Sequence, residues 1–223
     1  MIPSAFEGAR IVMCKELRVS FRQQAGWCAM LMFALTTLAC VSLSLSGGIL
    51  EPKLQAALLW VILFFSSMAG ADRGFADEDM AGTLPTLRLY GASQSVLWGK
   101  VGYTFCLLLI LAAFLVPLYL IFLDVMILRP LWLLAAIIVG MAGLSIAGTL
   151  LGALATGASV RGGIFTVLML PVILPVFLPG IALTDMAFGG EGAQGSYLLG
   201  MILYDLMLGV AASLLFDYLW YDD

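Results

Sequence analysis

Charged residues are almost absent from six long stretches of this 223-residue chain, and this absence limits the folds that are open to it. A helix needs about 20 apolar residues to cross the hydrocarbon core of a bilayer, and a charge near its centre costs roughly 2.5–3.5 kcal/mol on insertion scales. The stretches are residues 23–50, 54–71, 101–123, 130–160, 162–184 and 192–216, the last interrupted by Asp205. We therefore predict an all-α integral membrane protein with six transmembrane helices in a single domain, residues 1–223.

The amino-acid composition limits the classes of function that the chain can have. The chain is 63% hydrophobic and 11% charged, whereas soluble domains are about 25% charged. A net charge of -4 argues against nucleic acid as a partner. The absence of histidine removes the commonest metal ligand and general base. Gly99-Lys100 also lacks the upstream glycine of a phosphate-binding loop, so we expect no catalytic, cofactor-binding or metal-ligating residues and no enzyme activity of its own.

Basic residues predict the orientation, because loops on the cytoplasmic side carry the excess of Lys and Arg. In the six-span arrangement only Lys53 and Arg129 fall on the other side of the membrane. Both termini are therefore predicted to be cytoplasmic. The eight residues on that side are Arg10, Lys15, Arg18, Arg22, Arg73, Arg88, Lys100 and Arg161.

Residues 5–22 precede the first span and mix apolar with charged side chains. Phe6, Ile11 and Phe21 alternate with acidic and basic residues, as expected of an amphipathic helix lying in the headgroup plane. The alternatives are a loosely ordered basic tail or a cleaved signal peptide, although the polar lead is long for a signal.

Residues 72–100 form the longest polar interval between two spans, and we predict that this cytoplasmic loop is where another protein pushes on the membrane domain. Met80, Leu84 and Leu87 are spaced as one face of a helix, which Gly82 and Pro85 divide into two pieces. A short amphipathic helix suits docking into a partner's groove, and a solvated connector is the alternative. We expect Ser93 to cap the helix that follows.

The fourth and fifth spans carry unusual residues. Gly148 and Gly152 form a G-x-x-x-G pair in the fourth span, which favours close helix packing at the centre of the bundle or at a subunit contact. Pro171, Pro175 and Pro179 share one face of the fifth span, where each costs about 3 kcal/mol in an ordinary helix. We predict a broken or kinked span, followed by an outer loop at residues 184–196.

Asp205 is the one acid well inside a predicted span. An acid at such a depth is a functional-site hypothesis, with proton or substrate handling as its usual work. Alternatively, the start of this span lies at the outer interface and leaves Asp205 near water.

Several local patterns together resemble one known family. They are Lys15-Glu16-Leu17-Arg18 followed by Arg22; Asp72, Arg73, Phe75 and Asp77; Gly82, Leu84 and Leu87; the turn Arg161-Gly162-Gly163; and the run from Pro171 to Pro175. Over nearly its whole length the chain is similar to CcmB, the permease subunit of the haem-exporter ABC transporter of cytochrome c maturation. Pro85 departs from the family pattern, in which glutamate is usual there.

The resemblance implies one half of a permease homodimer of the ABC-2-like kind in a bacterial inner membrane, with an organellar inner membrane as the less favoured alternative. A CcmA-like ATPase would dock on the coupling residues of the loop, which are Asp72, Arg73, Phe75, Asp77, Gly82, Leu84 and Leu87. The ATPase would bind ATP. CcmC-like and CcmD-like proteins and a CcmE-like chaperone would handle haem. The alternatives are a secondary transporter or channel that uses Asp205, or a structural scaffold of the maturation complex.

Overall fold

The computed structural model describes residues 5–22, 24–45, 48, 50–71, 75, 78, 81–83, 87, 91–156, 163–190 and 195–221. In these ranges the regular structure consists of α-helices. The long helices are α1 (Ala5–Arg22), α2 (Ala25–Leu45), α3 (Pro52–Ala71), α6 (Ser93–Phe122), α7 (Pro130–Thr156), α8 (Gly163–Phe188) and α9 (Ser196–Tyr221).

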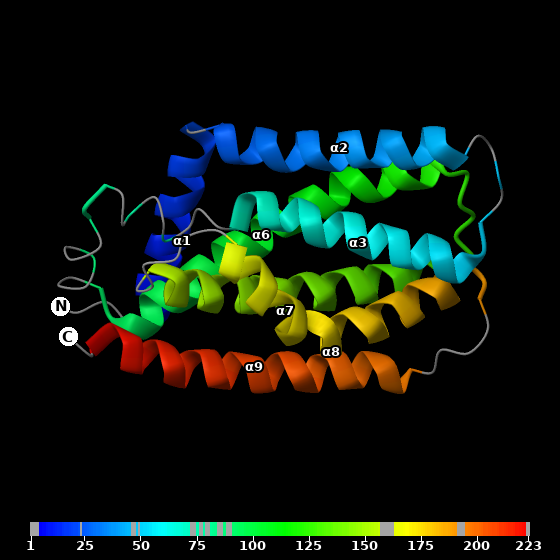
Figure 1. Ribbon diagram of the computed structural model, residues 1–223. Coiled ribbons are helices and arrows are strands. Elements are labelled where there is room, and N and C mark those ends of the chain that lie inside the picture. Colours follow the sequence, from blue (N-terminus) through cyan, green and yellow to red (C-terminus); the bar gives the residue numbers. More distant parts are fainter. Residues whose placement is uncertain are drawn as a thin grey trace.

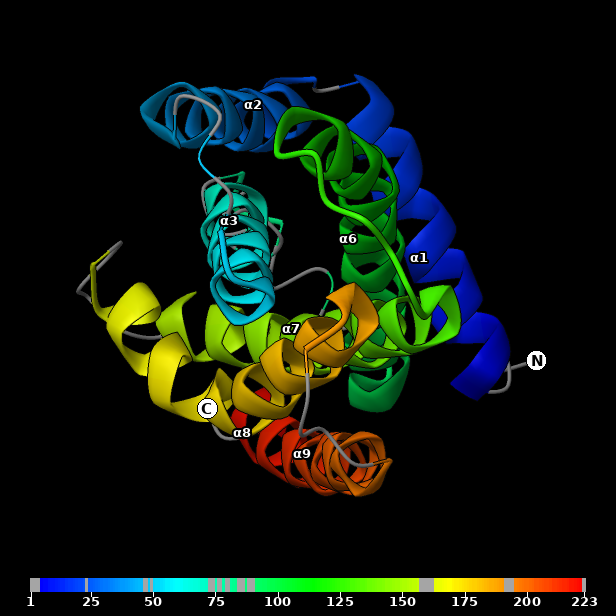
Figure 2. The same ribbon diagram turned by 90° about the vertical axis from the view of Figure 1, so that its right-hand side faces the viewer.

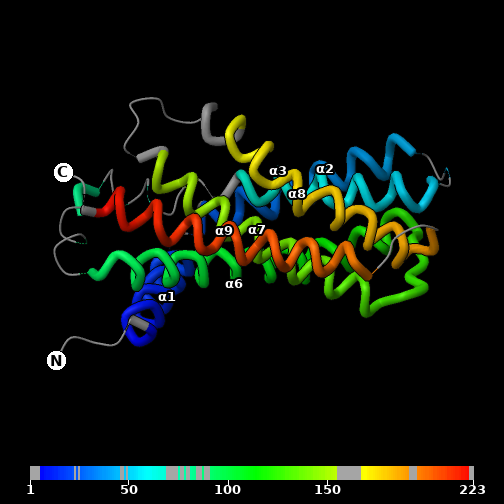
Figure 3. Tube along the Cα trace, turned by 90° about the horizontal axis from the view of Figure 1, so that it is seen from below, coloured from blue at the N-terminus to red at the C-terminus, as the bar shows by residue number. Residues whose placement is uncertain are grey.

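All the long helices except α1 run side by side, and each reverses the direction of the one before (Figure 1). The chain therefore begins and ends at the same end of the bundle, where α3 also ends and α6 begins. Helix α1 crosses this end at a steep angle and projects away from the bundle axis (Figure 3). We call this the α1 end.

Five helices of the described chain are long and apolar enough to cross a bilayer, which confirms the prediction of a multi-pass membrane protein. In α3 the apolar part is shorter, Pro52–Met68, so the sixth span stays a prediction. The five segments are Gly26–Leu45, Ser93–Phe122, Pro130–Leu154, Val167–Phe188 and Ser196–Trp220.

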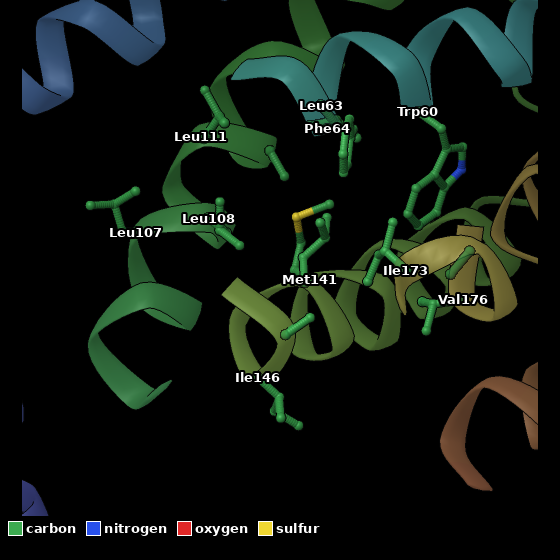
Figure 4. Packing of buried hydrophobic residues seen from close by; sticks show 14 of the residues in the cluster. Trp60, Leu63, Phe64, Leu107, Leu108, Leu111, Met141, Ile146, Ile173 and Val176 are labelled. Carbon is green, nitrogen blue, oxygen red and sulfur yellow. The ribbon is translucent and has the colours of Figure 1, made fainter. Parts of the chain in front are cut away.

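Helix α7 lies at the centre of the bundle, against α3, α6, α8 and α9 (Figure 2). Its glycines make this possible, because the indole of Trp60 from α3 fills the space that a side chain at Gly140 would need. Around Trp60 the core contains Phe64, Met141, Ile173 and Val176 (Figure 4). The predicted Gly148–Gly152 pair is not the tightest contact, since a Cβ at Gly152 would lie 3.9 Å from its nearest neighbour, Phe75.

Helix α6 begins at Ser93, close to the start predicted for the helix that follows this residue, so the second part of the 72–100 interval is helical and includes Lys100. Helix α8 continues to Phe188, beyond its predicted end, so the predicted outer loop begins after that residue. Near this end Thr184 accepts a hydrogen bond from Trp60 Nε1 at 2.9 Å.

Candidate functional site

Helix α1 packs closely against the first turns of α6 because both helices have glycine at the crossing. A Cβ at Gly99 would lie 2.6 Å from Val12 Cβ, and one at Gly8 would lie 2.7 Å from Ser95 Oγ. Helix backbones can approach this closely only where the side chains are small. The crossing brings Glu16 of α1 next to Lys100 of α6.

Four charged residues meet where α1 crosses α6, and we call them the charge cluster: Lys15 and Glu16 of α1, Lys100 of α6, and Glu78. Lys100 Nζ lies 3.0 Å from Glu16 Oε1 and 3.0 Å from Glu78 Oε2. Lys15 pairs with Glu78 and lies 3.2 Å from Glu16. Lys100 is 2% exposed, Glu16 8% and Glu78 9%, so the cluster excludes most water. Buried charges persist in a protein only when they are paired in this way.

The partners of Glu78 and Lys15 in the cluster favour the charged forms of these two residues. Burial by itself raises the pKa of Glu78, but the charge of Lys100 and a hydrogen bond from Lys15 outweigh burial and lower this pKa below its ordinary value. Burial lowers the pKa of Lys15, but hydrogen bonding to Glu78 and the charges of Glu16 and Glu78 raise it overall. Both shifts favour the charged forms of Glu78 and Lys15.

An aromatic chain continues from the cluster to the end of α9. Lys100 Nζ lies 4.5 Å from the ring centroid of Phe75, within the range of a cation–π interaction. The Phe75 ring contacts Phe216 at 5.9 Å between centroids, and Phe216 stacks on Trp220 at 5.2 Å. The connection after α3, which contains Phe75, is thus in contact with both α6 and α9.

Hydrogen bonds join the start of α6 to α9 as well. Gln94 Nε2 donates to the Ser213 carbonyl at 3.0 Å, and Trp220 Nε1 donates to the Gly91 carbonyl at 3.3 Å. The hydroxyl of Ser93 donates to Asp217, and Ala92 is the N-cap residue without a side-chain cap bond. The predicted cap at Ser93 is therefore wrong, because Ser93 is already the first residue of the helix.

The family model described as "CcmB: CcmB protein" matches residues 8–216. The chain belongs to the CcmB family. This supports a membrane permease subunit of the haem-export ABC transporter. The match includes the whole charge cluster and the Phe75–Phe216 contact. A search of curated proteins gives no match.

Of the coupling residues that the CcmB resemblance implied, the structure describes Phe75, Gly82 and Leu87. Phe75 is 4% exposed and lies beneath the surface, whereas Gly82 is exposed with a positive φ of 65°. Leu87 is half-buried and accepts a backbone hydrogen bond from Gly91 at 2.8 Å. Asp72, Arg73, Asp77 and Leu84 lie outside the described residues, as do Arg161 and Gly162.

None of the charge cluster was among the predicted site residues. One signal was available: Lys100 follows Val-Leu-Trp-Gly and precedes a long apolar run. A cation between apolar residues needs a paired acid. The sequence contains many acidic residues, and it does not show which of them pairs with Lys100. Glu16, one of its partners, is 84 positions away in the chain.

In the CcmB fold Gly163 begins α8, and the three prolines lie within this helix. Pro171 and Pro175 are exposed on its outer side, while Ile173 and Val176 face the core. The axis of α8 changes direction along its length (Figure 1). Tyr204 of α9 donates its hydroxyl to the Val172 carbonyl at 2.6 Å and so fastens this part of α8 to α9.

Asp205 lies inside the last span and not at its edge. It is 8% exposed, within the Ser196–Trp220 segment, and a Cβ at Gly143 of α7 would collide with its Oδ1. In the described chain neither carboxyl oxygen has a hydrogen-bond partner. Its depth relative to the membrane interface stays a prediction.

Proposed function

We propose that this chain is the six-span permease subunit of an ATP-driven haem-export complex, working as a homodimer in a bacterial inner membrane. It carries no catalytic machinery of its own. A CcmA-like ATPase binds ATP and docks at the α1 end, on the cytoplasmic side. CcmC-like, CcmD-like and CcmE-like partners handle haem, which is the cargo of the complex and not a resident group of this chain.

The charge cluster is the observation that carries this proposal, because it joins an exposed tip to the membrane helices. Residues 81–83 are exposed, and Thr83 donates its backbone N–H to the Glu78 carbonyl at 3.0 Å. The Glu78 side chain pairs with Lys100 of α6. Separating buried ion pairs is costly, so a displacement of the tip also moves α6 and, through Phe75, α9. This is what a subunit driven from outside the membrane requires.

Helix α1 adds a second surface at this end. Its Glu16 side faces the cluster, whereas Phe6, Ile11 and Phe21 are largely exposed. Exposed apolar side chains on a helix that also carries Arg10, Arg18 and Arg22 suit a position in the headgroup plane. Helix α1 thereby keeps the cluster at the level of the membrane surface while the tip reaches into the cytoplasm.

Gly82 provides the test. The positive φ of Gly82 is incompatible with proline, whose ring holds φ near −65°, whereas asparagine tolerates the left-handed region. We expect Gly82→Pro to lose most of the co-expressed ATPase in mild-detergent purification and Gly82→Asn to retain it. Full ATPase recovery with Gly82→Pro, at normal membrane levels, would place docking elsewhere.

Phe75 gives an independent test of the support beneath the tip. Phe75→Ala removes the ring between Lys100 and Phe216, so we expect it to weaken ATPase recovery as well. Phe114→Ala is the matched control, because Phe114 is 43% exposed on a spanning helix. Equal loss in both variants would indicate a general effect on folding and count against a specific role for Phe75.

The side of the membrane can be tested directly. A single cysteine at Ala81, in a variant without the four native cysteines, is exposed in the fold. An impermeant maleimide should label it only after the inner membrane is opened. Labelling from the periplasm would reverse the proposed orientation and with it the cytoplasmic docking of the ATPase.

An ion-driven transporter is the second candidate function, favoured by the buried, unpartnered carboxyl of Asp205. An ATPase partner inactivated in its own nucleotide site separates the two. Cytochrome c assembly should stop if this chain is an ABC permease. Assembly that continues would favour an ion-driven transporter or a scaffold.

A further inference from the structure

A groove of about 450 Å³ opens on the outer side of the bundle between α7, α9 and Trp98 of α6. Its walls are apolar and include Ile138, Ile146, Leu206 and Val210. Leu206 and Val210 are each 63% exposed. The groove lies along helices that cross the membrane, so its occupant is either lipid or another helix.

One polar group lies in this apolar groove. Asp205 lines it, is more than nine-tenths buried, and has no hydrogen-bond partner among the described residues for either carboxyl oxygen. On α9 the apolar residues Ile202 and Leu203 precede Tyr204-Asp205, and Leu206 and Met207 follow. Acids at this depth in membrane proteins pair with another residue, and lipid tails offer no such partner.

A second copy of this chain does not supply a basic partner at that depth. Of its ten Lys and Arg residues, Lys53 and Arg129 lie at the ends of spans and Lys100 belongs to the charge cluster. Of the remaining seven, Arg10, Lys15, Arg18 and Arg22 belong to α1, and Arg73, Arg88 and Arg161 lie outside the sequence ranges of the apolar spanning segments. A basic side chain facing Asp205 therefore has to come from a different protein.

We propose that this groove docks a transmembrane helix of another membrane subunit, one that carries an Arg or Lys level with Asp205. The apolar walls of the groove would contact the apolar side chains of the partner helix, and the carboxyl of Asp205 would pair with its single cation. Close approach of α9 to α7 at Gly143 holds Asp205 in place before the partner arrives. The inference deepens the proposed function and rests on it for the existence of a membrane partner.

A synthetic helix tests the groove without that partner. The full-length chain, in lipid nanodiscs, carries a photo-crosslinking residue at Val210 and is mixed with a leucine-rich transmembrane peptide that has one central Arg. The comparison peptide has Leu at that place. A second label position, Met207, is 62% exposed on the same helix but outside the groove lining. We expect several-fold more crosslinking of the Arg peptide at Val210, and no preference at Met207.

Variants at Asp205 decide whether the carboxylate is responsible. Asp205→Glu should keep the preference for the Arg peptide, and Asp205→Asn should abolish it with unchanged thermal unfolding. Equal crosslinking of the two peptides, a preference that survives in Asp205→Asn, or crosslinks only to lipid or to a second copy would each overturn the proposal. None of these outcomes involves ATPase docking, so this proposal and the proposed function fail separately.

Discussion

Lys100 of α6 and Glu16 of α1 lie 3.0 Å apart although both are almost fully buried. This pair connects the helix that crosses the α1 end to a helix that spans the membrane. Each residue also has a second partner of opposite charge, Glu78 for Lys100 and Lys15 for Glu16, so the pair is part of a network of buried charges. Four predictions follow from this contact and from its neighbours in the bundle.

Replacing Lys100 should destabilise the fold more than any exposed lysine does. Lys100→Met removes the buried cation of the cluster and leaves Glu16 and Glu78 with the more exposed Lys15 alone, and breaking a buried pair costs about 3–5 kcal/mol. Thermal unfolding in detergent measures the loss. The control is Lys53→Met, an exposed site, where a change within about 0.5 kcal/mol is expected. Similar unfolding temperatures for the two variants would show that the charge cluster does not stabilise the fold.

Acid should remove the contribution of Glu78. Because the folded protein holds the pKa of Glu78 below its ordinary value of 4.5, the unfolded state binds more protons between these two values. This contribution is complete above pH 4.5 and is lost as the pH falls through the lower, folded pKa. Unfolding temperature followed from neutral to acid pH should therefore fall more steeply for the natural chain than for Glu78→Gln. Parallel curves would contradict the ionic cluster.

A methyl group should be harmful at Gly140 and harmless at Gly200. Gly140→Ala pushes against the indole of Trp60, which is 1% exposed and cannot move freely, so a cost of about 1–3 kcal/mol is expected. Gly200→Ala meets nothing within 4 Å and should stabilise its helix by about 0.5–1 kcal/mol. Both effects are read from unfolding temperatures. If Gly200→Ala lost stability and Gly140→Ala did not, the packing of α3 against α7 would differ from that described.

The hydroxyl of Tyr204 should contribute to the attachment of α8 to α9. Tyr204→Phe removes its hydrogen bond to the Val172 carbonyl, worth about 0.5–1.5 kcal/mol. Tyr218→Phe is the matched control, since Tyr218 is 71% exposed. Hydrogen exchange at residues 172–179 should be faster in Tyr204→Phe and unchanged in the control.

The class of protein and the approximate helix positions are readable in the sequence because they depend on local composition. Charge-free apolar runs have one stable solution in a bilayer, which is a helix across it. The helix bounds are less predictable where a polar residue finds a partner from elsewhere in the chain. Lys100 was assigned to the polar interval 72–100, yet it is buried in α6, where Glu16 and Glu78 compensate its charge.

The coupling residues that the CcmB resemblance implied show the same limit. Phe75 was expected at a docking surface, but its side chain is 4% exposed and lies between Lys100 and Phe216. Contacts between segments so distant in the chain depend on how helices cross, and periodicity within one segment contains no information about that. That this region couples to an ATPase stays a prediction, and the packing shows which of its described residues are buried and which are exposed.

The sequence alone determined that the chain lies in a membrane, approximately where its helices are, and which family it resembles. Hydropathy and short motifs are properties of neighbouring residues, so they can be read without the fold. Only the tertiary structure decided that Glu16, Glu78 and Lys100 meet and that Asp205 lines a groove. The physical reason lies in small residues at the helix crossings: Gly8 and Gly99 let α1 approach α6, and Gly143 lets Asp205 approach α7. Such approaches bring together charges that the linear sequence separates.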